Sequence, residues 1–292
     1  MSLLRRVVDA TGHLRYSGMR TVEFSAAGIV RSHTEYVLAD GRRSRVDFPS
    51  DSAYHGQVIV DDGKQRLHYF PGRHEVLRQP SGAEDAPSRV VEQIVAGRAP
   101  REELSVTDGG LVAGRSCREV SISNRRGVLQ QNIWVDPDTG MVLKREVYTA
   151  RGERIADFEF ERIDYKAPIR DDDFKIQADG AKTVTPEDLL RQLQTRNQLR
   201  PVMLAAGSGS HLQSSRELLA GKVRLIQAVY LAKQGRVVLF QGRYAFSQEE
   251  LGKAAPKDVS FYTWSSGGEH YALVGKMDEG TLRRLAQSVQ GA

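Results

Sequence analysis

The residue types in this chain that could carry catalysis or bind a metal are spread thinly along it. Five histidines follow no metal-ligand spacing, and we expect them to be exposed or packed: His33, His55, His68, His74 and His211. Asp171, Asp172 and Asp173 are consecutive, and consecutive side chains cannot all face one ion. We therefore expect a solvated turn at these aspartates, with weak calcium binding as the alternative.

The remaining candidate motifs are also incomplete. Cys117 lies in an alternating, strand-like segment with no base partner that the sequence identifies, which favours a buried structural thiol over a nucleophile. The segment Gly207-Ser-Gly209-Ser has neither the third glycine nor the long preceding strand of a phosphate loop. No Gly-x-Ser-x-Gly elbow is present. The sequence therefore predicts no enzyme, no cofactor and no metal site.

Composition describes an ordinary globular chain with a mild basic excess. The 292 residues are 40% hydrophobic and 27% charged, and the net charge is +5. Basic residues occur as separated pairs at positions 5–6, 42–43 and 125–126, so we do not expect nucleic-acid binding. An acidic partner or an anionic lipid surface fits this charge about equally well.

Compartment signals are weak in this sequence. One cysteine allows no intrachain disulfide, and no apolar run approaches the roughly 20 residues of a membrane span. The first residues carry no signal peptide and lead directly into a predicted helix. We interpret this opening as the start of a chain from which a preceding segment has been trimmed.

The secondary-structure pattern predicts many sequential antiparallel strands with a few helices. Residues 131–147 are typical of a strand, a turn over Asp136–Gly140 and a second strand. Residues 57–70 indicate another hairpin around an Asp-Gly turn. Helices are predicted at residues 3–13 and 88–95. We therefore expect an α+β fold: a large curved antiparallel sheet, or unclosed β-barrel, with helices packed on it.

The chain beyond residue 178 predicts a smaller α+β domain. Thr185-Pro186-Glu187-Asp188 has the pattern of a helix start. Strands follow at 223–231 and 236–240, a short helix starts at residue 247, a hairpin spans 259–275, and a helix covers 278–289. The predicted division is a sheet domain at 1–178, a linker with a helix at 179–213 and a small domain at 214–292.

Aromatic side chains from different predicted strands are the candidate ligand-binding residues. If the sheet curls, they would converge on an apolar cavity of lipid size, whereas an ordinary packed core is the alternative for each of them. The candidates are Phe24, Tyr36, Phe48, Tyr69, Trp134, Tyr148, Phe158 and Phe160.

The order of these features resembles the MucB/RseB sigma-factor regulators, whose N-terminal domain is similar to the lipoprotein carriers LolA and LppX. The features that carry the resemblance are the first helix followed by Tyr16-Ser-Gly18, the hairpin VIVDDGKQRLHYF, Ala113-Gly114-Arg115 before a strand, the hairpin IWVDPDTGMVLKREV, and the ending FEFERIDYKAPIRDDDFKI. Beyond residue 176, the strand pair RLIQAVYLAKQGRVVLFQGR and the ending EHYALVGKMDEGTLRRLAQSV also fit these regulators. The segment RPVMLAAGSGSHLQSSREL departs from the family pattern. The strand that is rich in aromatic residues in the family also has fewer of them here.

The resemblance implies a periplasmic or otherwise extracytoplasmic, non-enzymatic protein at the membrane periphery. Its large domain would accept acyl chains, and its small domain would help to bind the periplasmic segment of a membrane anti-sigma factor. Binding would shield that factor from proteolysis, and a lipid or lipoprotein signal in envelope stress would release it. A periplasmic carrier of lipid or lipoprotein is the alternative, and a homodimer is left open.

Overall fold

The computed structural model describes residues 2–10, 12–26, 29–81, 103–124, 126–149, 151–220, 223–247 and 259–290. The helix predicted at 88–95 lies outside these ranges, as does the helix predicted to start at residue 247, apart from that first residue. The chain forms two compact units: Met1–Val76 with Pro80–Lys182, and Leu77–Gln79 with Thr183–Ala292.

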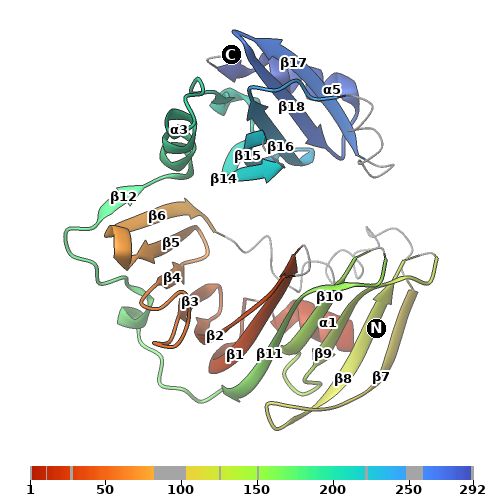
Figure 1. Ribbon diagram of the computed structural model, residues 1–292. Helices are drawn as coiled ribbons and strands as arrows, with labels where there is room; N and C mark the ends of the chain where they lie inside the picture. Colours follow the sequence, from red (N-terminus) through yellow and green to blue (C-terminus); the bar gives the residue numbers. More distant parts are fainter. Residues whose placement is uncertain are drawn as a thin grey trace. The chain divides into compact units, whose positions relative to one another are not determined.

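A 12-stranded sheet dominates the first unit, in the order β12-β6-β5-β4-β3-β2-β1-β11-β10-β9-β8-β7 (Figure 1). The order has two ends, so the sheet is open, and the α+β fold with a large antiparallel sheet is confirmed. The strands are β1 Arg15–Ala26, β2 Ile29–Asp40, β3 Arg43–Asp47, β4 Val58–Asp61, β5 Gln65–Phe70, β6 Glu75–Pro80, β7 Glu103–Val112, β8 Arg115–Ser123, β9 Leu129–Val135, β10 Val142–Tyr148, β11 Arg154–Asp164 and β12 Lys182–Val184.

Turn chemistry sets the two hairpins that the sequence predicted. Between β4 and β5, the Asp62 carboxylate accepts hydrogen bonds from the backbone N–H groups of Lys64 and Gln65, each at 2.8 Å. Between β9 and β10, the Gly140 N–H donates to the Asp136 carbonyl at 2.8 Å, and the Asp136 N–H donates to the Met141 carbonyl at 2.9 Å. Local side-chain and backbone bonds therefore fix the register of both hairpins.

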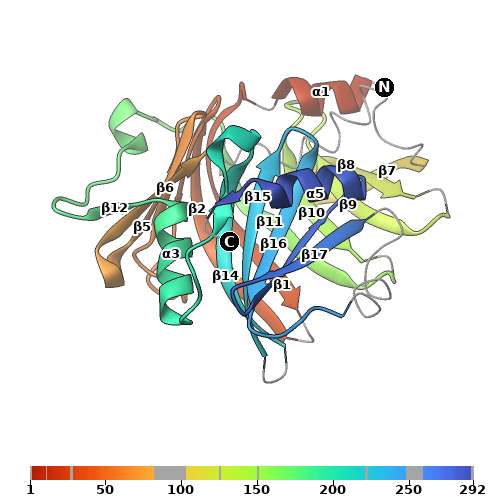
Figure 2. The ribbon, with the colours of Figure 1, turned by 90° about the horizontal axis from the view of Figure 1, so that it is seen from above.

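The short helix α1 (Ser2–Ala10) packs on β8, β9 and β10 (Figure 1, Figure 2). Its Leu4 and Val7 are buried against residues that include Ile133 and Val135. The turn after β9 touches the helix as well, because a Cβ on Gly140 would lie 2.4 Å from the Arg6 carbonyl oxygen. Gly140 also has φ of +77°, so this turn requires glycine both for its backbone and for its contact with α1.

A second core of the first unit contains Val112, Cys117, Leu143 and Phe160. Cys117 is 2% exposed, as predicted for a structural thiol. Burial raises the pKa of this thiol, which keeps it protonated and unreactive near neutral pH.

The second unit contains a five-stranded antiparallel sheet in the order β14-β15-β16-β18-β17. Its strands are β14 His211–Ala220, β15 Val223–Ala232, β16 Gly235–Gly242, β17 Ser260–Ser266 and β18 Glu269–Gly275. The helices α3 (Pro186–Arg196) and α5 (Glu279–Gln287) flank this sheet (Figure 2), and β13 (Met203–Leu204) pairs with β19 (Val289–Gln290). The predicted helix start is confirmed, since Thr185 and Asp188 form a reciprocal capping box.

The core of this unit begins before residue 214. Leu190 on α3, together with Leu199, Val202 and Leu204, belongs to the same buried cluster as Tyr271 and Leu273 of β18. Most of the segment expected to act as a linker at 179–213 therefore contributes structure to the second unit. The division into 1–178, 179–213 and 214–292 stays a prediction.

A buried polar network, which the sequence did not indicate, ties α3 to this sheet. The Gln194 amide donates to the Gln241 side-chain oxygen at 2.9 Å, and the Gln241 amide donates to Glu269 at 2.7 Å. The Arg200 N–H and the Tyr271 hydroxyl also donate to Glu269, at 2.8 and 2.9 Å. Burial, together with the hydrogen bond to Glu269, raises the pKa of Tyr271 to about 12, so its hydroxyl stays a donor.

Candidate functional site

The strand register divides the predicted aromatic residues between the two faces of the large sheet. Tyr36 pairs with Asp47, Asp47 with Val58, and Val58 with Tyr69, so these four side chains form a row on one face. Phe24 lies on the opposite face, as its position across from Arg31 shows. The pleat therefore separates residues that the sequence grouped together.

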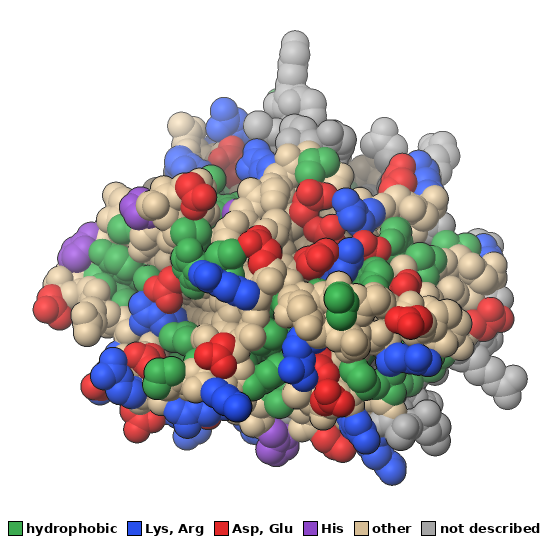
Figure 3. Space-filling model, turned by 90° about the horizontal axis from the view of Figure 1, so that it is seen from below, with side chains coloured by type: hydrophobic (Ala, Val, Ile, Leu, Met, Phe, Trp, Pro, Cys, Tyr) green, Lys and Arg blue, Asp and Glu red, His purple; other side chains and the backbone are tan. Residues whose placement is uncertain are grey.

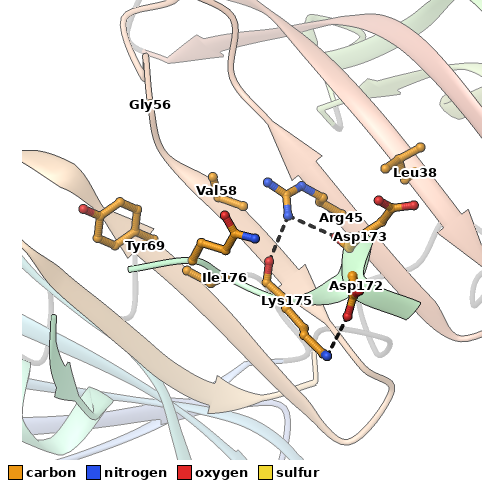
Figure 4. Close-up of a pocket in the computed structure, with 10 residues that line it drawn as sticks. Leu38, Arg45, Gly56, Val58, Tyr69, Asp172, Asp173, Lys175 and Ile176 are labelled. Carbon is orange, nitrogen blue, oxygen red and sulfur yellow. Dashed lines mark hydrogen bonds and ion pairs between the residues drawn. The ribbon is translucent and has the colours of Figure 1, made fainter. Parts of the chain in front are cut away.

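An open groove of about 570 Å³ lies on the face that carries Tyr36 and Tyr69 (Figure 4). Its lining consists of Leu38, Arg45, Gly56, Val58, Tyr69, Asp172, Asp173, Lys175, Ile176 and Gln177. Leu38 on β2, Val58 on β4 and Tyr69 on β5 provide apolar surface from the sheet, and Ile176 adds apolar surface from the covering segment. The groove thus combines a few apolar side chains with a lining that is mostly polar and charged.

A second groove of about 480 Å³ shares Leu38 with the first. Its lining consists of Ser17, Gly18, Tyr36, Val37, Leu38, Asp47, Arg162, Ile163 and Asp164. The strand residues among the lining of the two grooves come from six adjacent strands, β5 to β1 and β11. At a strand spacing of about 4.8 Å, five intervals give the pair of grooves a reach of roughly 24 Å. Such a surface fits an extended ligand better than a compact one.

Two arginines on β3 hold the segment Asp171–Gln177, which we call the strap, against this face. Arg45 donates to the carbonyl oxygens of Asp173 and Lys175, both at 3.0 Å (Figure 4). It also forms a bidentate pair with Asp47 at 2.6 and 2.8 Å. The hydrogen bonds that Arg45 donates to Asp47 raise the pKa of Arg45, so its guanidinium is charged throughout the physiological range.

Arg43 holds the first part of the strap. Its guanidinium donates to the Asp171 carboxylate at 2.7 Å and lies 4.6 Å from the centre of the Phe174 ring. The alternation of Arg43, Arg45 and Asp47 on one face of a strand was present in the sequence. The sequence did not show that they pair with a segment some 128 residues away.

The opposite face carries an aromatic cluster around His33. Its ring stacks on Phe24 with centroids 6.1 Å apart, and it also contacts Phe48 at 5.6 Å and Tyr54 at 4.9 Å. The same imidazole lies 3.0 Å from a carboxylate oxygen of Glu35. The structure thus brings together two of the eight predicted residues, Phe24 and Phe48, although Phe24 is 49% exposed.

The remaining four predicted residues lie nearer the other end of the sheet. Phe158 and Phe160 meet edge to face with centroids 6.2 Å apart, and Phe160 is a core residue at 1% exposure. Trp134 lies 4.7 Å from the Lys144 ammonium, and Tyr148 donates to Glu146 at 2.5 Å. The assignment of all eight residues to one cavity stays a prediction.

The three adjacent aspartates bind three different partners. Asp171 accepts from Arg43, Asp172 pairs with Lys175 at 2.7 Å, and Asp173 accepts from the Arg170 N–H at 2.7 Å. Among the residues that the structure describes, no group of three or more potential ligands is arranged to hold a metal ion. The helices in the described part of the chain include none that is long and apolar enough to cross a membrane.

Charge on the surface is mixed in sign. Figure 3 shows acidic and basic side chains interspersed across the face seen there, with hydrophobic side chains between them.

Among the residues lining the two grooves there is no histidine or cysteine to act as a base or a thiol nucleophile. The apolar and charged side chains that line the grooves suit a ligand with apolar and polar parts.

An open antiparallel sheet bearing a helix, followed by a smaller α+β unit, defines the class of fold. No protein-family model matches the chain, and no curated protein matches its sequence. Its fold is similar to that of MucB, whose crystal structure has 16% sequence identity and a TM-score of 0.50. The match covers 99% of this chain and 97% of that chain, so the resemblance expected from the sequence is confirmed for the fold.

Two further solved structures are similar over different lengths. The complex of Pseudomonas aeruginosa MucA/MucB has 16% identity, covers 99% of this chain and 97% of that chain, and has a TM-score of 0.48. A LolA superfamily protein from Nitrosomonas europaea has 11% identity and a TM-score of 0.32, and covers 60% of this chain and 96% of that chain.

Proposed function

We propose that this protein is a periplasmic regulator that binds the extracytoplasmic segment of a membrane-anchored anti-sigma factor. The observation that carries the proposal is the likeness in fold to MucB across both units. MucB has been solved in complex with MucA, which supports a partner of the same kind here. The proposed role is binding without catalysis.

The finer part of the proposal is that lipid or lipoprotein controls this binding. The paired grooves support it, because the apolar side chains of Leu38, Val58 and Tyr69 lie in one groove with the charged side chains of Arg45 and Lys175. An amphipathic ligand would place its chain against the apolar side chains and its polar group beside the charged ones. The eight aromatic residues remain the proposed ligand contacts, of which Tyr36 and Tyr69 lie in these grooves.

A pull-down tests the partner. The purified protein is incubated with the extracytoplasmic segment of the anti-sigma factor encoded beside its gene, with an unrelated extracytoplasmic segment as the control. We expect capture at micromolar concentration with the first segment alone. Failure to capture it at that concentration would falsify the proposed function.

A periplasmic lipid or lipoprotein carrier is the second candidate, because the grooves lie within the first unit alone. Native mass spectrometry after gentle purification separates the two functions. A carrier retains acyl-containing ligand and binds no anti-sigma segment, whereas a regulator binds the segment and loses it when lipid is added. Protein that is free of lipid and indifferent to added lipid would exclude the carrier.

A further inference from the structure

Net charge is divided unequally between the two units of the chain. The second unit, residues 77–79 and 183–292, holds 15 lysines and arginines against nine aspartates and glutamates, for a net charge of +6. The first unit holds 27 against 28, for a net charge of −1. The basic excess of the chain therefore belongs to the second unit, and attraction to an anionic partner would act there.

One end of the five-stranded sheet collects four arginines from separate parts of the sequence. The start of β15 pairs with the end of β16, and the end of β17 lies at the same side through its pairing with β18. The segment after α3 reaches this end too, because the Arg243 guanidinium donates to the Gln198 carbonyl at 2.8 Å, and the Arg200 guanidinium donates to the Ser266 carbonyl at 2.6 Å. The four residues are Arg196, Arg200, Arg224 and Arg243.

Carboxylates neutralise only part of the arginine charge at this end. Glu217 accepts hydrogen bonds from both Arg196 and Arg224, each at 3.0 Å, so two positive charges share one negative charge. Glu269 is buried and already accepts three hydrogen bonds. In the described part of the second unit, these two are the carboxylates among the residues that meet here, so a surplus of positive charge remains. The side chains of Arg196 and Arg224 are 66% and 68% exposed, which leaves them open to a partner.

An exposed aromatic residue adjoins these arginines. Tyr244 follows Arg243 directly, and it is 61% exposed. A tyrosine ring has an apolar body and a polar hydroxyl, and such rings are enriched where the head groups of a bilayer meet its acyl chains. Exposed arginines beside an exposed tyrosine favour an anionic bilayer, because lipid phosphates suit the guanidinium groups and the interface suits the ring.

We propose that this end of the second unit binds the surface of an anionic phospholipid bilayer. Its contacts are Arg196, Arg200, Arg224, Arg243 and Tyr244. The proposal goes beyond the proposed function, because it gives the chain a contact with lipid head groups that needs no protein partner. The arginines donate charge-assisted hydrogen bonds to lipid phosphates, and the Tyr244 ring enters the interface.

Sedimentation of the full chain with vesicles tests the proposal. The vesicles contain either phosphatidylcholine alone or equal parts of phosphatidylcholine and phosphatidylglycerol. We expect binding to the anionic vesicles alone, and we expect this binding to weaken as salt is raised. No binding to the anionic vesicles at low salt would overturn the proposal.

A pair of double variants locates the contact. Arg224→Gln with Arg243→Gln is the test, and Lys233→Gln with Arg236→Gln is the control of equal charge change, at the other end of β15 and β16. Each basic residue close to an anionic bilayer strengthens binding roughly fivefold. The test variant should therefore bind roughly twenty-fivefold more weakly, and the control should stay within about threefold of the unaltered protein, because charge away from the surface is screened. Equal losses in the two variants would overturn the assignment to this end.

Tyr244→Trp provides a second readout that does not remove charge. On addition of anionic vesicles, the introduced tryptophan should shift its emission to the blue and be quenched by brominated acyl chains, with the unaltered protein as the background for Trp134 and Trp264. Soluble poly-glutamate stands in for an acidic protein. Binding of poly-glutamate without binding of anionic vesicles, or a tryptophan that brominated lipid does not quench, would overturn the proposal. None of these measurements uses the anti-sigma segment, so the bilayer contact and the proposed function can fail separately.

Discussion

Asp136 is a buried carboxylate that organises the turn between β9 and β10. It is 1% exposed and accepts hydrogen bonds from Arg115 at 3.0 Å, the Asp138 N–H at 3.0 Å and the Tyr165 hydroxyl at 3.3 Å. Asp136→Asn should lower the free energy of unfolding by about 2 kcal/mol, because a charged hydrogen-bond acceptor is lost from a buried site. Urea denaturation measures this change. Asp138→Asn is the matched control, and its exposed carboxylate predicts a change below about 0.5 kcal/mol.

The same carboxylate predicts how stability depends on pH. Burial alone would raise the pKa of Asp136, but hydrogen bonds from Arg115, the Asp138 N–H and Thr139 bring the net pKa below its usual value. A depressed folded-state pKa contributes stability above the unfolded value, near 3.9, and that stability is lost as pH falls through the folded pKa. The difference between the unaltered protein and Asp136→Asn should therefore persist from pH 7 to about pH 4 and shrink below it. A difference that is constant down to pH 2 would contradict this assignment.

His68 predicts a further loss of stability on acidification, in a higher pH range than that of Asp136. Burial, followed by the positive charges of Arg66 and Arg73, lowers the pKa of His68 to about 4. The folded protein keeps this imidazole neutral while the unfolded chain takes up a proton near pH 6.5, so His68 costs stability as pH falls from 6.5 towards 4. We expect His68→Gln to reduce the loss of stability between pH 7 and pH 5. NMR titration of His68 checks the cause directly, and a midpoint above pH 6 would exclude it.

At the scale of elements, two glycine variants can separate the stability that comes from contact between the β9–β10 turn and α1 from the cost of backbone strain. Gly140 and Gly152 have φ of +77° and +81°, but only at Gly140 does an added Cβ meet the Arg6 carbonyl oxygen. We expect Gly152→Ala to cost about 1 kcal/mol of unfolding free energy and Gly140→Ala to cost about 2–4 kcal/mol. Urea unfolding of both variants gives the comparison. Equal losses would mean that α1 does not depend on this turn.

The polar network of the second unit links α3 to β16 and β18. Gln241 donates to Glu269 and to the Arg200 carbonyl and accepts from Gln194, so Gln241→Leu would leave three buried groups without this partner. We expect a loss of about 2–4 kcal/mol in unfolding free energy. Gln227→Leu on the neighbouring strand β15 is the control, because its partner is an exposed arginine, and its change should stay below about 1 kcal/mol. A similar loss for both variants would contradict the role of the network.

Elements specified by short-range chemistry were predictable from the sequence. Asp62 and Gly63 determine their hairpin within four residues, and Thr185 with Asp188 determines the start of α3 in the same way. The strap was not predictable, because Arg45 bonds to a segment 128–130 residues away, and nothing local marks that partner. The grouping of aromatic residues was incomplete for a related reason. Strand alternation is visible in sequence, but which strands align, and on which face, depends on long-range register.

At the scale of the whole molecule, the predicted boundary at residue 214 can be tested by comparing two fragments. Leu190, Leu199, Val202 and Leu204 all precede that boundary and belong to the core of the second unit. We therefore expect the fragment 183–292 to be more stable than the fragment 214–292. Each large apolar side chain removed from a core lowers the free energy of unfolding by several kcal/mol. Thermal unfolding followed by circular dichroism measures the difference. Equal stability would support the shorter domain.

We propose above that this chain binds an extracytoplasmic anti-sigma segment and that lipid controls the binding. The most direct test is calorimetric titration of the protein with that segment, first alone and then after addition of a short-chain phospholipid below its micellar concentration. We expect saturable binding of the segment with Kd in the micromolar range or tighter, and weaker binding when lipid is present. Absence of heat at micromolar concentrations, with the segment shown to be intact, would contradict the account.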